Sequence, residues 1–78
     1  MSIAEFLRAD LWLTPESGPR YVQLRRRLQE GIDTGVLAPN SSLPSERELV
    51  EITELSRVTV RKAIQELVQE GIIEQRQG

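Results

Sequence analysis

The chain of 78 residues contains no cysteine and no histidine. Without cysteine it can form neither a disulfide framework nor a thiolate metal site, which suits a reducing, cytoplasmic location. The absence of histidine excludes the usual zinc sites and histidine-based acid–base catalysis. No stretch is long and apolar enough to span a membrane, and the first residues lack the features of a signal peptide. We therefore expect a cytoplasmic chain with no metal, no cofactor and no membrane partner.

Acidic side chains are plentiful, but their arrangement does not indicate catalysis. No pair of carboxylates lies in a recognisable pocket-forming motif, and no glycine-rich loop that could cradle a phosphate is present. We therefore do not expect an enzyme. The formal net charge of −2 argues by itself against a nucleic-acid partner. The distribution of charge matters more, because a local basic stripe can bind phosphates while acids lie elsewhere.

Two capped helices joined by a short turn are the central prediction. Ser45 stands three residues before Glu48, which is the spacing of a capping box, and Pro44 disfavours helix upstream. Ser56 can cap a second, longer helix, whose apolar residues recur at helical spacing until Gly71, a residue suited to a C′ position. A short helix, a tight turn and a longer helix are typical of a helix-turn-helix, in which the second helix enters the major groove of DNA.

The second helix is expected to expose a face opposite its apolar stripe, formed by Arg57, Val58, Arg61, Lys62 and Gln65. Arginine can bind guanine O6 and N7 in bidentate fashion, and glutamine can do the same for adenine. Val58 has no folding reason to lie there, but it could pack on a thymine methyl. The alternative is a solvated helix face with one stray valine, since single exposed apolar residues are common.

An amphipathic helix is predicted over residues 2–11, with Ser2 as its cap. Its apolar side consists of Ile3, Phe6, Leu7 and Leu11. Trp12 and Leu13 extend this apolar surface, so the segment should pack against another apolar surface. Two interpretations are open: docking against its own domain, or contact with a second protomer or neighbouring domain. A turn-rich linker over residues 14–18 follows.

The main domain is expected over residues 19–78, preceded by the N-terminal helix and linker over residues 1–18. Pro19 can open a helix that Gly35 stops, with Tyr21, Leu24, Leu28 and Ile32 as its core stripe. Three arginines at 25–27 could touch phosphates, but a solvated or salt-bridged surface is the favoured interpretation. Residues 39–41 are predicted as a turn, and residues 72–76 as a strand that leads into a hairpin turn at Gln77 and Gly78.

Helix, short strand, helix-turn-helix and hairpin strand, in that order, make a winged helix-turn-helix, a mainly α fold with a small β wing. Several segments also resemble the DNA-binding domain of GntR-family bacterial transcription regulators. They are Pro19–Leu24, Gly31 to Pro39, Leu43–Leu49, Ser56–Ile64, and Glu70–Ile73 with Arg76–Gly78. The similarity runs from about residue 19 to the last residue without a gap.

The resemblance implies a dimeric repressor or activator, with repression favoured, that binds double-stranded DNA at short inverted-repeat operators. It also implies a larger C-terminal domain, absent from this chain, that binds a small-molecule effector and supplies most of the homodimer contact. The wing is therefore expected to be incomplete here. A winged-helix module that docks proteins without binding DNA is the alternative, since the fold alone does not assign a function.

The resemblance also assigns DNA contacts to individual residues. Arg47, near the start of the first motif helix, would contact DNA. Arg57 and Arg61 on the recognition helix would reach bases or their phosphates, with Val58 at the variable position between them.

Phosphate contacts are assigned in the same way to Ser45, Ser56 and Thr59, although the two serines also suit a purely capping role. Gln77 and Gly78 would form the wing tip, which enters the minor groove. Three positions depart from the family pattern: glycine is common where Asn40 and Glu54 stand, and a basic residue is usual at Gln75.

Overall fold

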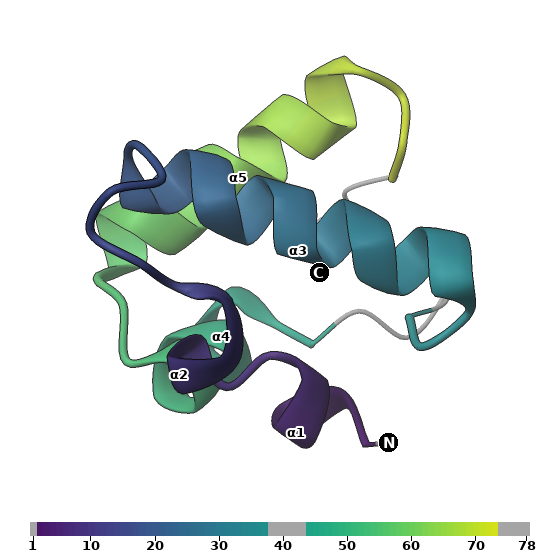
Figure 1. Cartoon of the computed structure of the whole chain (residues 1–78). Helices are drawn as coiled ribbons and strands as arrows, with labels where there is room; N and C mark the ends of the chain where they lie inside the picture. Colours follow the sequence, from purple (N-terminus) through teal and green to yellow (C-terminus); the bar gives the residue numbers. More distant parts are fainter. Residues whose placement is uncertain (1, 38–43, 74–78) are drawn as a thin grey trace.

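The computed structural model describes residues 2–37 and 44–73. Over these residues the chain forms five helices: α1 (Ile3–Phe6), α2 (Ala9–Trp12), α3 (Arg20–Thr34), α4 (Glu46–Thr53) and α5 (Arg57–Gln69). The two long helices, α3 and α5, lie side by side, and α4 packs against α5 (Figure 1). No helix within the described parts of the chain combines the length and apolarity that crossing a membrane requires.

The helix α3 follows the predicted pattern closely. Pro19 is its N-cap, so the helix begins at Arg20, one residue later than expected, and Gly35 ends it in the left-handed conformation at φ 87°. Glycine suits this C-terminal position because it has no Cβ to clash. Leu24 and Leu28 are fully buried. The amide of buried Gln23 bonds to the backbone of residues 14–18, so the linker is tied to the helix.

The caps of α4 and α5 are those that the sequence predicted. The amide of Glu48 donates to Ser45 Oγ at 3.1 Å, and the Glu48 carboxylate accepts from the Ser45 amide, which completes the capping box. At the second helix, Ser56 Oγ accepts from the Thr59 amide at 3.2 Å. Between the helices Glu54 adopts φ 60°, in the left-handed region where glycine is favoured. The helix-turn-helix prediction is therefore confirmed.

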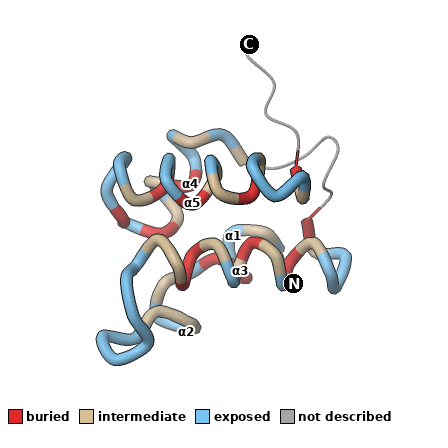
Figure 2. The backbone as a smooth tube through the Cα atoms, turned by 90° about the horizontal axis from the view of Figure 1, so that it is seen from above, coloured by how far each residue is buried: buried red, intermediate tan, exposed pale blue. Residues whose placement is uncertain are grey.

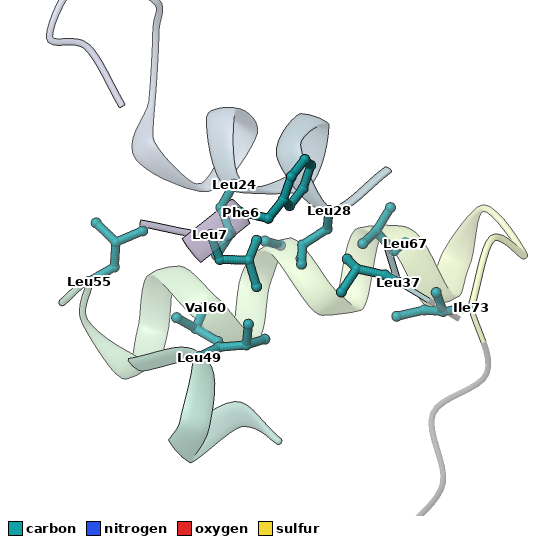
Figure 3. Packing of buried hydrophobic residues seen from close by; sticks show 11 residues of the cluster. Phe6, Leu7, Leu24, Leu28, Leu37, Leu49, Leu55, Val60, Leu67 and Ile73 are labelled. Atoms are coloured by element: carbon teal, nitrogen blue, oxygen red, sulfur yellow. The ribbon is translucent and has the colours of Figure 1, made fainter. Parts of the chain in front are cut away.

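The core lies between α3 and the α4–α5 pair, and Figure 2 shows buried residues on the facing sides of α3 and α5. Leu24 and Leu28 of α3 belong to one cluster there with Val60 and Leu67 of α5 (Figure 3). Gly31 of α3 leaves room for this packing, because a Cβ at that position would lie 2.7 Å from Leu37 Cδ1 and 2.9 Å from Phe6 Cε2. Phe6 and Leu7 from the N-terminal segment are buried in the same cluster.

The single helix predicted over residues 2–11 is wrong, because the segment forms two short helices with a break at Leu7 and Arg8. Side chains take the carbonyl groups that a continuous helix would need. Arg27 Nε donates to the Phe6 carbonyl at 2.9 Å, and Trp12 Nε1 donates to the Leu7 carbonyl at 3.1 Å. Ser2 still caps the first helix as predicted.

The expected β elements are not present within the described residues. Leu37 is buried in the core but is not part of a strand, and the predicted turn at 39–41 lies outside the described residues. The start of the predicted wing strand, Ile72 and Ile73, forms a bend. The Ile72 amide donates to the Leu67 carbonyl and closes the C-terminus of α5, while Gly71 adopts φ 74°. Residues 74–78, including Gln77 and Gly78, lie outside the described residues.

Candidate nucleic-acid interface

The exposed face of α5 has the composition that the sequence predicted. Val58 is 76% exposed, and the side chains of Arg57 and Arg61 are 72% and 57% exposed. Val60 and Ala63 are fully buried on the opposite face. The predicted helical phase is therefore confirmed, and this face can meet a groove of DNA without disturbing the core.

A carboxylate from the neighbouring helix lies between the two arginines of this face. Arg61 approaches Glu46 with two nitrogens, Nε at 3.3 Å from Oε2 and Nη2 at 3.2 Å from Oε1. The Nε atom of Arg57 lies 3.7 Å from the same Oε1. Sequence reasoning did not single out Glu46. Its position in the first turn of α4 gave no local signal, because the short turn joins the opposite end of α4 to α5.

Arg47, the other arginine predicted to contact DNA, is on α4. Its side chain is exposed, and its Nε lies 3.6 Å from the carboxylate of Glu51, one turn along the same helix. Exposed pairs of this kind hold a side chain only weakly, because solvent screens the attraction. Arg47 can therefore exchange its carboxylate partner for a phosphate.

Three hydroxyl groups lie near the starts of the motif helices. Ser45 and Ser56 act as caps, and Ser56 Oγ also donates to Thr59 Oγ1 at 2.8 Å. A capping oxygen accepts a hydrogen bond through a lone pair and keeps its own hydrogen for donation. Ser45 could donate that hydrogen to a phosphate directly, and Ser56 could do so indirectly, through the hydroxyl of Thr59. Capping and phosphate binding are therefore compatible.

Three further cations of α3 and α5, Arg25, Arg27 and Lys62, make contacts within the domain. Lys62 lies over the ring of Tyr21, 4.3 Å from its centroid. Arg25 pairs with Glu66 of α5 and with Glu70, its C-cap residue, and Arg27 pairs with Glu30. The salt-bridged interpretation is thus confirmed for these two arginines.

A model of one family, described as bacterial regulatory proteins of the gntR family, matches residues 20–78. The chain belongs to this family. Members of the GntR family are transcription regulators with a helix-turn-helix, so membership confirms the predicted DNA-binding regulatory function and the prediction that the chain is not an enzyme. It also favours DNA binding over the alternative of a protein-docking module.

Similar proteins include YurK of Bacillus subtilis, an uncharacterized transcriptional regulator that is 45% identical over 80% of this chain. The transcriptional repressor NagR of the same organism is 43% identical over 77% of the chain, and the regulator GgaR of Escherichia coli is 36% identical over 85%. These matches cover 26%, 25% and 27% of the three relatives, so the chain spans about a quarter of their length. No solved structure matches the chain.

Proposed function

We propose that this chain is the sequence-specific DNA-binding domain of a metabolite-responsive bacterial repressor, which acts in the cytoplasm as a dimer on inverted-repeat operators. The observation that carries the proposal is the exposed α5 face, where Arg57, Val58 and Arg61 all point to solvent. Arginine forks and a small apolar group are what guanine edges and thymine methyl groups require. A relative whose name describes it as a repressor, NagR, supports repression.

The individual roles follow from position and chemistry. Arg57 and Arg61 read base edges or adjacent phosphates, and Val58 packs on a base between them. Arg47 contacts the DNA backbone from the first motif helix. Phosphate oxygens accept from the hydroxyls of Ser45 and Thr59, and Ser56 supports this contact by donating to Thr59 Oγ1. The role of Gln77 and Gly78 as a wing tip in the minor groove rests on the resemblance to the family.

Dimeric binding rests on a physical argument about affinity. One recognition helix with a few phosphate contacts should bind near the non-specific range, about 10⁻⁴–10⁻⁶ M. Two copies held one helical turn apart on an inverted repeat raise the effective concentration of the second copy. We assign the tether and the small-molecule effector to a C-terminal domain of the whole protein. This chain alone is expected to be monomeric at micromolar concentration, because Phe6 and Leu7 are buried in its own core.

Duplexes selected from a random pool provide the test. Binding of the selected duplex is titrated over a series of salt concentrations, and log affinity should fall linearly with log salt as counterions are released. Arg57→Ala and Arg61→Ala should each weaken binding by about 1–3 kcal/mol without lowering the melting temperature. Arg26→Ala is the matched control, since Arg26 lies on α3 beside Trp12 and Glu30. Equal affinities for the wild type and both α5 variants would refute the assignment.

A further inference from the structure

Glu46 is an unusual neighbour for a DNA-binding face, because its negative charge opposes phosphate binding. Its side chain is 29% exposed, less than either arginine that it contacts. The capping box at Ser45 and Glu48 fixes the start of α4, and a carboxylate is favoured in this first turn by the helix dipole. The Glu46 carboxylate therefore lies at a defined place between α4 and α5.

We propose that Glu46 is a positioning residue, which holds Arg61 so that its outer edge faces guanine. This inference rests on the proposed role of α5 in reading bases. Arg61 meets Glu46 side-on, through Nε and Nη2. A guanidinium carries five N–H groups, so two are used here, and the two hydrogens of Nη1 and one of Nη2 remain. These form the end-on fork that matches O6 and N7 of guanine. Arg61 can therefore bind guanine while it keeps Glu46.

The two arginines are held to different degrees. Arg57 makes one longer contact with Glu46, at 3.7 Å, and its side chain is the more exposed of the two. Pre-ordering of a long side chain lowers the entropy that it loses on binding. Pre-ordering by Glu46 should therefore add more affinity at the base that Arg61 reads than at any contact made by Arg57.

The negative charge of Glu46 adds selectivity. A guanidinium that is already paired with a carboxylate gains less from a phosphate than an unpaired one would. Discrimination depends on the difference between affinities for the right and wrong DNA, so weakening the wrong complex is as effective as strengthening the right one. Glu46 should therefore lower binding to unselected DNA while it supports guanine recognition.

The test compares Glu46→Gln with the wild type on the selected duplex, on its single-guanine variants and on a scrambled duplex of the same composition. Glutamine keeps the size of the side chain and removes its charge. The guanine preference at one position should fall about tenfold, while affinity for the scrambled duplex should rise several-fold. Asp33→Asn is the control, because it removes the same charge from α3, and it should leave guanine preference unchanged.

A double variant separates positioning from a general charge effect. If Glu46 acts through Arg61, then Glu46→Gln in an Arg61→Ala background should not change guanine preference further. A stronger and equal affinity of Glu46→Gln for every duplex, with guanine preference intact, would overturn the positioning role. Failure of the proposed function has a different signature: Arg61→Ala itself would then leave binding of the selected duplex unchanged. Melting temperatures confirm that each variant is folded.

Discussion

Two pairs of arginines, Arg25 and Arg27 on α3 and Arg57 and Arg61 on α5, have similar partners but different environments. All four lie close to carboxylates. The α3 pair is mostly buried, at 20% and 16% exposed, whereas the α5 pair is largely open to solvent. An ion pair alone therefore does not distinguish a structural arginine from one that we propose to bind DNA. Burial does, because a guanidinium that covers the core cannot leave it to meet a phosphate.

The largest effect on stability is expected at Phe6, whose ring lies under Arg27. Phe6 is 5% exposed, and the Arg27 guanidinium lies 3.8 Å from the centre of its ring. Phe6→Ala should lower the free energy of unfolding by about 3–5 kcal/mol, because it leaves a cavity in a small core. Urea denaturation measures this loss. Leu11→Ala is the control in the same segment, since Leu11 is exposed. Similar losses for the two variants would show that the segment is not part of the core.

The second prediction concerns Arg27 itself. Arg27→Ala removes the donor to the Phe6 carbonyl and the cover over the ring, so the free energy of unfolding should fall by about 1–3 kcal/mol. Duplex affinity of the folded protein should not change, which is the reverse of the Arg61→Ala result. Thermal melting and a binding titration on the same sample give both values. If a fully folded Arg27→Ala protein bound the duplex more weakly, burial would not separate the α3 arginines from the α5 arginines.

A smaller effect is expected in the turn that sets α4 against α5. The backbone of Glu54 is in the left-handed region, at φ 60°. For a residue with a Cβ this conformation costs about 1 kcal/mol that glycine avoids. Glu54→Gly should raise the free energy of unfolding by about this amount and leave DNA binding unchanged. Glu54→Ala serves as a control, because alanine retains the Cβ and should give no such gain. Equal stability of the two variants would place the strain elsewhere.

The smallest effect on stability is expected at Val58. Because this side chain is exposed, Val58→Ala should change the free energy of unfolding by about 0.5 kcal/mol or less. It should nevertheless alter base preference where the selected duplex carries thymine. Selection from a random pool with the variant and with the wild type reveals that change. Identical selected sequences would assign Val58 to the solvated face of an ordinary helix.

Helix ends were predictable from the sequence because their chemistry is local. Ser45, Ser56 and Gly71 act on amides and carbonyls within a few residues, and each has the predicted role. At Glu54 the family resemblance supplied the signal, since glycine is common there, and the observed φ of 60° is the one that favours glycine. The α5 face followed from helical spacing alone.

Two features could not be read from local patterns, because they depend on contacts between distant residues. At the break after α1 the Phe6 carbonyl accepts from Arg27, which is twenty-one residues along the chain. The contact of Glu46 with Arg61 spans fifteen residues and depends on how α4 sits against α5. In both cases the sequence contains the two residues but does not show that they lie close together in space.

The close packing at Gly31 has a consequence for the way the domain opens. Helices of four residues, such as α1, would fray constantly in isolation. Here Phe6 and Leu37 both pack on the bare backbone of α3, in space that a single methyl group would fill. The N-terminal segment and the end of the α3 connection therefore share one cooperative unit. Amide hydrogens around Phe6 should exchange with solvent only when α3 and α5 separate, at the rate of global unfolding rather than of a loose chain end.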